Sequence, residues 1–323
     1  MKFPRILISL VITCLVLAGF SPGVAAADPL VIATGGTSGV YYTYGEAIAG
    51  ILAQELEGTE VTVSVTAGSV ENMQLVGSGD ASIAFALGDI AADAIAGNAP
   101  FDSPVPGRAL MTLYNNYTHI ITRSDSGLTS IADLAGKRVS LGAEGSGTAV
   151  IARRILTAAG IDPETGIEPG DLGLDDSAVA LATRTIDAFF WSGGLPTPAI
   201  AELAPIGITL IPSGEITATL RERYGAIYST DTIPAGTYPG QADKVDVMVV
   251  PNVLVVNESM DAELAYTIVS TLFAHTADLA AAHPEAAILS PESAARNSPI
   301  PYHEGALRYY QEHNIPVATP STS

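Results

Sequence analysis

Four short turns rich in Gly, Ser and Thr carry the side chains of this sequence that are best placed to bind a ligand. Each lies between an apolar run and an expected helix: Gly36-Thr37-Ser38-Gly39, TAGSVEN with Ser69, Gly88-Asp89, and GAEGSGT with Ser146, Gly147 and Thr148. In a parallel sheet, ligands bind beyond the carboxyl ends of the strands. A helix that begins there presents free N–H groups and a partial positive charge. The turns can therefore hold an anion without Lys or Arg, although turn geometry alone would also explain each glycine.

Other polar and aromatic residues near these turns extend the candidate set. Ser69 can cap the helix that carries Glu71 and Asn72. Glu71 and Asp89 can accept a hydrogen bond from an ammonium or hydroxyl group. Trp191 is the only tryptophan and ends the apolar run IDAFFW. It belongs either to a core or to a cleft wall, and its place at a strand end favours the cleft.

Signatures of catalysis and metal binding are missing from the sequence. There is no Gly-x-Ser-x-Gly elbow, and GKR at 136–138 lacks the rest of a phosphate-binding loop. In HEGAL, Leu307 stands where a zinc motif needs its second histidine. The only cysteine is Cys14, and the five histidines show no metal spacing. We therefore expect no enzyme, no metal site and no cofactor.

The charge balance excludes two classes of partner. With 14 Lys+Arg against 34 Asp+Glu, the formal net charge of the 323 residues is −20. A nucleic-acid binder needs a basic face, and an anionic membrane surface attracts basic segments. The length suffices for two ordinary domains, and the charge favours a soluble monomer.

Residues 1–27 read as a secretory signal peptide. Lys2 and Arg5 precede an apolar core, and Ala25 and Ala27 fit a small-x-small cleavage site. The apolar core is short for a retained membrane anchor, and the residues around Cys14 do not suit lipidation. The sequence predicts a protein secreted across the inner membrane and soluble in the periplasm.

The remaining chain alternates between strand-like and helix-like segments, which predicts an α/β fold. Strands are expected at 30–34, 61–66 and 81–86 with helices at 40–56, 70–76 and 89–97, followed by a second unit with segments at 137–142, 146–159, 186–191 and 207–212. Long extended runs at 109–123 and 245–257 would be hinge strands between two lobes, and Pro251 in the second run indicates an edge strand or a bend. We assign 28–117 and 251–323, mostly helical from Met260, to lobe 1, and 118–250 to lobe 2. A single large sheet is the competing interpretation.

Six motifs in order along the chain resemble one protein family. They are ATGGTSGVYYTYG, TAGSVENMQLVGSGDASIAFALGD, DLAGKRVSLGAEGSGT, IDAFFWSGGLP, GTYPGQADKVDV and HEGALRYYQEHNI. The chain is similar to the TAXI family of solute-binding proteins of tripartite ATP-independent periplasmic (TRAP) transporters. The resemblance implies a two-lobed periplasmic-binding-protein fold of type II, with two crossover hinge strands and a ligand cleft between the lobes. It also implies delivery of a small organic acid, such as a glutamate-like amino acid or a dicarboxylate, to TRAP permease subunits.

The resemblance carries over a set of ligand contacts by position. They are Thr37, Ser38, Tyr41, Glu71, Asn72, Asp89, Ser146, Gly147, Thr148, Trp191, Ser192 and Gly193. One departure is Ala86-Leu87-Gly88-Asp89, where many relatives read Val-Gln-Ser-Asp; it predicts two lost polar groups at the cleft. The residues themselves favour a small carboxylate with a hydrogen-bond donor, such as an amino acid or hydroxy acid. An ABC-type or sensor-linked binding protein and a secreted α/β hydrolase are the competing functions.

Overall fold

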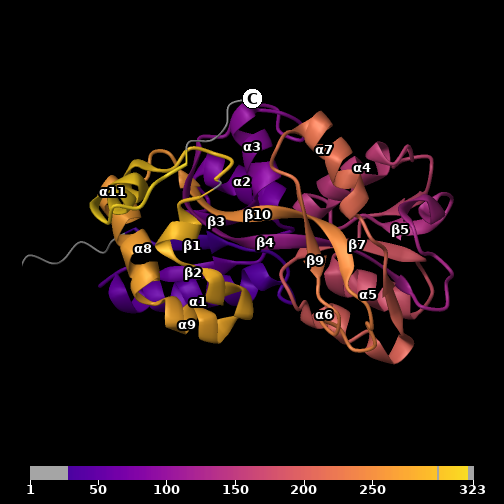
Figure 1. Cartoon of the computed structure of the whole chain (residues 1–323). Helices are drawn as coiled ribbons and strands as arrows, with labels where there is room; N and C mark the ends of the chain where they lie inside the picture. Colours follow the sequence, from indigo (N-terminus) through magenta and orange to yellow (C-terminus); the bar gives the residue numbers. More distant parts are fainter. Residues whose placement is uncertain (1–27, 297, 319–323) are drawn as a thin grey trace, which may run out of the picture.

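Two long antiparallel strands, β4 (Gly107–Arg123) and β10 (Val245–Asn257), connect the two halves of the molecule (Figure 1). They match the two long extended runs expected from the sequence. The computed structural model describes residues 28–296 and 298–318. The expected signal peptide at 1–27, including Cys14, lies outside the described residues.

The remaining strands are short and lie on both sides of this central pair. In chain order they are Leu30–Ala33 (β1), Val61–Ser64 (β2), Ile83–Leu87 (β3), Arg138–Ser140 (β5), Glu168–Gly170 (β6), Ala188–Gly193 (β7), Ile208–Leu210 (β8) and Ser229–Ile233 (β9). Their order across the sheet is β2-β1-β3-β10-β4-β7-β5-β6, while β8 pairs with β4 and β9 with β10. The hydrogen bonding is therefore that of one continuous mixed sheet, as the competing interpretation supposed, whereas the arrangement in space is two-lobed.

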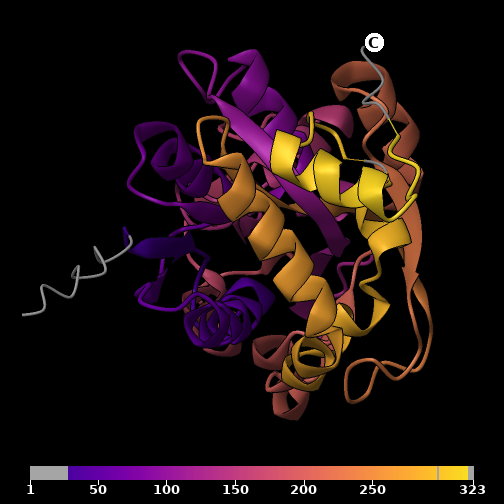
Figure 2. The ribbon, with the colours of Figure 1, turned by 90° about the vertical axis from the view of Figure 1, so that its left-hand side faces the viewer.

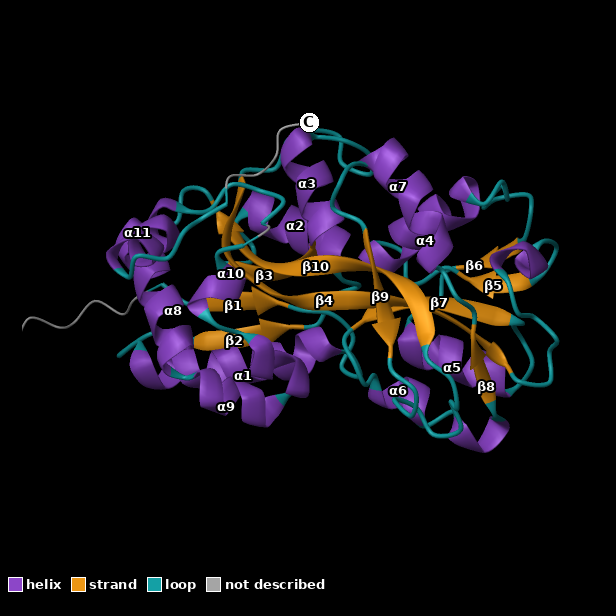
Figure 3. Cartoon of the chain, viewed as in Figure 1, coloured by secondary structure: helices purple, strands orange, loops and turns teal. Residues whose placement is uncertain are grey.

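The helices lie on both faces of this sheet (Figure 3). They span Val40–Glu55 (α1), Ser69–Ser78 (α2), Gly88–Ala96 (α3), Gly147–Ala158 (α4), Leu174–Ala182 (α5), Pro198–Ala201 (α6), Thr217–Tyr224 (α7), Ala262–Ala274 (α8), Thr276–Ala282 (α9), Pro291–Ala294 (α10) and Glu304–Glu312 (α11). Short 3₁₀ turns occupy Ile131–Leu134, Ala204–Ile206, Gly214–Ile216 and Pro284–Ile288. Within the described residues, no helix is long and apolar enough to cross a lipid bilayer.

The first half folds as its hydrophobic pattern predicts. Strand β1 pairs in parallel with both β2 and β3, and α1 and α2 connect them. Every residue of β3 is buried, because helices cover both faces of a parallel sheet at its centre. On α1, the expected stripe from Val40 through Tyr44 and Ile48 to Leu52 is buried. The amphipathic period thus identifies this helix and the face that it packs on the sheet.

The chain after β10 returns to the first half. Helices α8 and α9 contact α1, and α11 packs on α8 at the end of the molecule that faces the viewer in Figure 2. The Tyr310 hydroxyl donates to the Leu110 carbonyl at 3.0 Å, which ties α11 to β4. The C-terminal segment therefore packs on the first half, where the sequence assignment expected it, while the lobe boundaries themselves stay a prediction.

Strand β10 bends near its middle. Its register with β4 shifts between Pro251 and Val253 and again between Leu254 and Val255. Pro251 lies within a central strand, so the bend expected from the sequence is the correct interpretation and the edge position is not. Asn116 and Tyr117 of β4 pair with Val250 and Val249. The expected boundaries at 117/118 and 250/251 thus fall beside each other, and as boundaries of lobes they stay a prediction.

The contact between α1 and β1 yields the first testable prediction. A Cβ at Gly45 would lie 2.5 Å from Cγ2 of the buried Thr34. We expect Gly45→Ala to lower the free energy of unfolding by about 1–2 kcal/mol, because overpacking outweighs the gain in helix propensity. Gly50→Ala is the matched control, since the same helix has open space there. It should stabilise by about 0.5–1 kcal/mol. Urea unfolding of both variants checks this, and an equal effect of the two would refute the packing argument.

Candidate functional site

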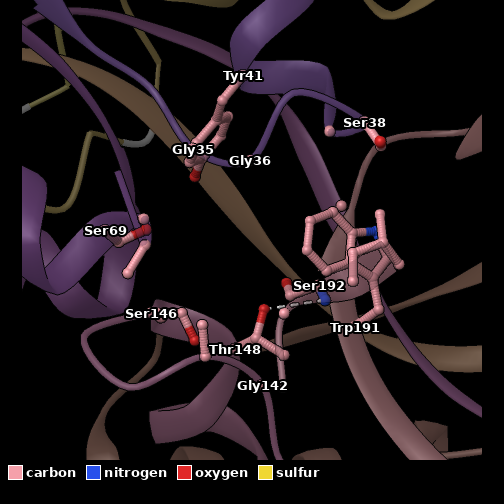
Figure 4. A pocket seen from close by; sticks show the side chains of 18 of the residues that line it. Gly35, Gly36, Ser38, Tyr41, Ser69, Gly142, Ser146, Thr148, Trp191 and Ser192 are labelled. Atoms are coloured by element: carbon pink, nitrogen blue, oxygen red, sulfur yellow. Dashed lines mark hydrogen bonds between the residues drawn. The ribbon is translucent and has the colours of Figure 1, made fainter. Parts of the chain in front are cut away.

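A cavity of about 190 Å³ lies between the two halves (Figure 4). Its walls come from the β1–α1 turn and the start of α2 on one side, and from the starts of α4 and α5 on the other. Strands β4 and β7 contribute further lining residues, including Asn116, Trp191 and Ser192. Both halves thus supply lining residues, which is the arrangement expected of a cleft that closes around a ligand.

Four helices begin at this cavity. The residues at their starts that line it are Gly39 and Val40 of α1, Gly68 and Ser69 of α2, Ser146 and Gly147 of α4, and Gly173 and Leu174 of α5. Among the described residues that line the cavity there is no Lys, Arg or His. The positive electrostatic contribution at this site therefore comes from main-chain N–H groups and helix dipoles.

The start of α4 is held by its own side chains. The Ser146 hydroxyl accepts a hydrogen bond from the Ala149 N–H at 3.1 Å and so caps the helix. The Thr148 hydroxyl accepts from the Ser192 N–H at 3.3 Å, which ties α4 to β7. Gly147 packs against the other half, because a Cβ there would lie 2.5 Å from Cδ1 of Leu87 and 3.0 Å from the Ser69 hydroxyl. Only glycine allows the two helix starts to approach this closely.

Trp191 forms part of the cavity wall, as its position in the sequence suggested. Its ring folds back over Gly193, where a Cβ would lie 2.4 Å from the indole nitrogen. The indole N–H donates to the Thr197 hydroxyl at 3.1 Å. The far edge of the ring faces Gly39 of the other half. The Trp191 ring can occupy this position because Gly193 on one side and Gly39 on the other have no side chain.

A buried polar network supports Trp191 from behind. The Thr197 N–H donates to the Tyr238 hydroxyl at 3.2 Å, and that hydroxyl is 2.8 Å from Nε2 of His119. Nδ1 of His119 lies 2.9 Å from the Tyr117 carbonyl oxygen. A carbonyl only accepts, so Nδ1 carries the proton and Nε2 accepts from Tyr238. Burial lowers the pKa of His119 to about 4, so the ring is neutral at pH 7.

Tyr41 connects the cavity with the central strands. Its ring stacks on Phe85 with centroids 5.1 Å apart, and its hydroxyl donates to Oδ1 of Asn252. The amide nitrogen of Asn116 donates to the same Oδ1 at 2.6 Å. Burial raises the pKa of Tyr41 above its ordinary value, so the hydroxyl keeps its proton and remains a donor.

Direct contacts join the two halves around the cavity. The Ser38 hydroxyl donates to the Asp175 carboxylate at 2.9 Å, and the Glu71 N–H donates to the Gly145 carbonyl at 3.1 Å. Arg154 of α4 forms ion pairs with two carboxylates of α3, Asp89 at 3.2 Å and Asp93 at 2.5 Å. These contacts hold the halves together on more than one side of the cavity.

The structure brings most of the expected ligand contacts to the cavity. The lining includes Ser38, Tyr41, Ser146, Gly147, Thr148, Trp191, Ser192 and Gly193. Thr37 instead lines a separate hollow beside α6 and His283. Its neighbour Ser38 lines both hollows, because the turn passes between them.

Three further expected contacts have structural roles and do not line the cavity. The Glu71 carboxylate accepts from the Ala67 N–H at 2.7 Å, and the buried Asn72 amide donates to the carbonyls of Thr34 and Phe85. The Asp89 carboxylate accepts from the Tyr228 hydroxyl at 2.8 Å and pairs with Arg154. Burial raises the pKa of Asp89, while Arg154 and Tyr228 oppose that shift. Helix α2 starts at the cavity, and Leu87, just before α3, lines it, but these three side chains turn into the packing.

The departure at Leu87-Gly88 has two different outcomes. Leu87 lines the cavity, so an apolar side chain does stand there. Gly88 does not, because a Cβ at this position would lie 3.1 Å from both Pro251 and Pro299. The expected loss of a second polar group at the cleft was therefore wrong.

Several residues of the cavity were not predicted from the sequence. Tyr114 and Asn116 belong to a polar interruption, YNNYTH, inside the long extended run. Asp175 and Asp176 open α5, a helix that the sequence analysis did not predict. The sequence did contain signals for these residues. Amide and hydroxyl side chains in a buried strand need hydrogen-bond partners, which points to Tyr114 and Asn116. Gly173 followed closely by two aspartates is typical of a helix start, which points to α5.

Comparison with known proteins agrees with this geometry. The chain matches the NMT1-like family over residues 32–313. It belongs to the NMT1-like family. This NMT1-like chain has an α/β fold with a curled mixed sheet, and it shares this fold with a binding-protein component of an ABC transporter.

Three solved structures illustrate the shared fold. A protein from Bordetella bronchiseptica RB50 is 17% identical over 88% of this chain and 98% of its own, with a TM-score of 0.55. A binding-protein component of an ABC phosphonate transporter from Pseudomonas aeruginosa is 11% identical over 80% and 78%, with a TM-score of 0.54. A structure from work on glutathione import via GshT and the cystine ABC importer TcyBC of Streptococcus mutans is 12% identical over 79% and 92%, with a TM-score of 0.51. At these identities the likeness shows the fold alone.

The helix cap at Ser146 yields the second prediction. We expect Ser146→Ala to lower the free energy of unfolding by about 1 kcal/mol, because the Ala149 N–H loses its acceptor. Ser146→Asp is the control, since an aspartate caps equally well and should change stability by only a few tenths of a kcal/mol. Thermal unfolding of the two variants at pH 7 makes the comparison. Equal losses in both would show that Ser146 stabilises the fold by something other than capping.

The buried histidine yields the third prediction. Its pKa is about 4 in the folded chain and about 6.5 when unfolded, so below pH 6.5 the unfolded state binds more protons. The stability that neutral His119 contributes is complete above pH 6.5 and is lost as pH falls through 4, in total about 3 kcal/mol. Unfolding of the unmodified protein and of His119→Gln should be compared from pH 7.5 to 4. The difference between their stabilities should change by about this amount; parallel curves would contradict it.

Proposed function

We propose that this NMT1-like chain is an extracytoplasmic solute-binding protein that captures a small organic acid by closure of its two halves. The supporting observation is the cavity itself, which both halves line and at which four helices begin. Its N–H groups suit a carboxylate, and its hydroxyls from Ser146, Thr148 and Ser192 suit further polar groups of a small ligand. A ligand that contacts both halves favours the closed state by its differential affinity.

We further propose that the ligand passes to a membrane transporter of the TRAP type. The six motifs that resemble the TAXI family support this partner, and the secretory leader expected at 1–27 supports a periplasmic location. An ABC importer is the second candidate, because two of the matched structures are described with ABC transporters. A large multi-span permease gene next to this one would favour TRAP, and an ATPase gene would favour the ABC type.

A binding role also accounts better for the cavity than catalysis does. Among its described lining residues, Asp175 and Asp176 are the only ionisable carboxylates, and Asp175 already accepts from Ser38. Within the described residues, no group of three or more His, Cys, Asp and Glu side chains is arranged to hold a metal ion. The cavity can thus recognise a ligand through helix dipoles and side-chain hydroxyls. We propose that the protein releases its ligand chemically unchanged.

Closure and ligand class yield the fourth prediction. In a melting screen, amino, hydroxy, keto and dicarboxylic acids should include stabilisers, whereas sugars and metal cations should not. A ligand at one hundred times its dissociation constant adds about 2.7 kcal/mol to stability. Small-angle scattering should then show a smaller radius of gyration. The emission of Trp191, the only tryptophan, should change because its ring forms the cavity wall.

Ser146→Asp supplies the control for charge in this experiment. It keeps the helix cap but places a carboxylate at the cavity, so acid binding should weaken at least tenfold while the fold persists. Stabilisation by a sugar or a cation and by no acid would overturn the ligand class. A radius of gyration that stays unchanged at saturation would overturn the closure.

A further inference from the structure

Four buried polar side chains share one face of the sheet beneath the cavity. Tyr114, Asn116 and Thr118 alternate along β4, and Ser192 of β7 lies directly opposite Thr118. Their exposed fractions are 2%, 1%, 0% and 7%. Each has a side-chain oxygen with no hydrogen-bond partner among the described residues. Buried polar atoms in proteins are nearly always paired, so a cluster of unpaired ones calls for an explanation.

The position of this cluster suggests that a ligand completes it. Tyr114, Asn116 and Ser192 all line the cavity. In Figure 4, the Ser192 hydroxyl points from β7 towards the open centre between Tyr41 and Thr148. An unpaired buried acceptor costs the protein stability, and a ligand group that pairs with it removes that cost on binding. The floor of the cavity is therefore a polar subsite separate from the helix starts.

The orientation of the Asn116 amide follows from its neighbours. The Tyr114 carbonyl only accepts, so the Asn252 group that lies 3.2 Å from it must be the amide nitrogen. Oδ1 of Asn252 then accepts from Asn116, which must present its own nitrogen at 2.6 Å. That nitrogen also donates to the Tyr41 hydroxyl at 3.3 Å. Both amide hydrogens of Asn116 are thus used, and its free atom is the carbonyl oxygen.

We infer that Asn116 is a specificity-determining residue whose carbonyl oxygen accepts a hydrogen bond from the ligand. This inference rests on the proposed function and narrows its ligand class. An acceptor held in one orientation selects an acid that carries an N–H or O–H donor beside its carboxylate. It disfavours an oxo acid, whose oxygen would face the oxygen of Asn116, and an unsubstituted dicarboxylate, which leaves that oxygen unpaired. Amino acids and hydroxy acids both supply such a donor.

Asp175 and Asp176 are the competing acceptors for the same donor. They belong to the first turn of α5, and Oδ2 of Asp175 already accepts from Ser38 across the cleft. Asn116 lies instead on the central strand β4, next to Asn252 of β10. A preference for donor-bearing acids that originates at α5 would disappear in Asp175→Asn or Asp176→Asn and survive a change at Asn116.

The test measures binding of matched acids to the full-length mature protein by calorimetric titration. One series is glutamate, 2-hydroxyglutarate, 2-oxoglutarate and glutarate; a shorter one is aspartate, malate and succinate. Within a series that binds, we expect the amino or hydroxy acid to bind at least about tenfold more tightly than the oxo or unsubstituted acid. Equal or tighter binding of the oxo acid would overturn the inference while leaving the proposed function intact. Failure of every acid to bind would overturn the proposed function as well.

Variants then locate the preference. In Asn116→Leu the ratio of affinities should fall to about one, chiefly through weaker binding of the donor-bearing acid. Thr112→Val is the matched control, because Thr112 is a buried β4 residue that does not line the cavity, and the ratio should stay unchanged there. If Asn116→Leu does not fold, the same ratio of affinities is measured in the unmodified protein and in the two aspartate variants, and these values test the inference. A ratio that survives in Asn116→Leu, or that vanishes in an aspartate variant, would refute the role of Asn116.

Discussion

The pairing of β4 with β10 is the constraint on which the rest of this structure depends. Both strands belong to both halves, so their register determines how the helix starts of one half face those of the other. Because the ladder is continuous, neither half can shift along the other without breaking main-chain hydrogen bonds. Relative motion is therefore confined to bending and twisting of these strands. The irregular pairing after Pro251 is one of two places where β10 departs from a regular ladder with β4, and Asn252 lies within it.

The same stretch of β4 and β10 that connects the halves also supports the cavity. Asn252 of β10 holds Tyr41 and Asn116, and both line the site. His119, two positions beyond Tyr117, supports Trp191 through Tyr238 and Thr197. A group bound in the cavity thus contacts side chains anchored on the strands that must bend when the halves move. In the proposed function, binding and closure therefore share residues and need no separate relay between distant sites.

Much of the fold could be predicted because local patterns match it. The two long extended runs, the buried stripe of α1 and the Ser146 cap all follow from short-range chemistry. Helix α7, with the sequence TATLRERY, has only Thr217 and Leu220 buried, so no apolar period announces it. Strand β6 reads EPG and is too short for alternation to mark it. The continuity of the sheet was only the competing interpretation, because it depends on pairings between strands far apart in sequence.

The sequence predicts which turns form the site, but it does not predict which side chains in those turns face the cavity. Sequence shows that α3 begins at a strand end, yet Asp89 faces away from the cavity because Arg154, 65 residues later, and Tyr228 hold its carboxylate. Asn72 likewise donates to the carbonyls of Thr34, just after β1, and of Phe85 within β3. Asn116 was not predicted because the sequence does not show which atoms of a polar side chain within a strand are paired by distant neighbours and which atom stays unpaired.

A binding site made of helix starts also affects how such a protein can diverge. The N–H groups at Val40, Ser69 and Leu174 belong to the main chain, and every residue type except proline supplies one. Replacing a side chain there leaves the donor in place as long as the helix still begins at that residue. Substitutions such as the apolar Leu87 can then alter the size and shape of the molecule accepted without removing the attraction for an anion. Under the proposed function, a change of preferred acid would therefore require few substitutions, whereas a change to a cationic ligand would require the helix starts themselves to move.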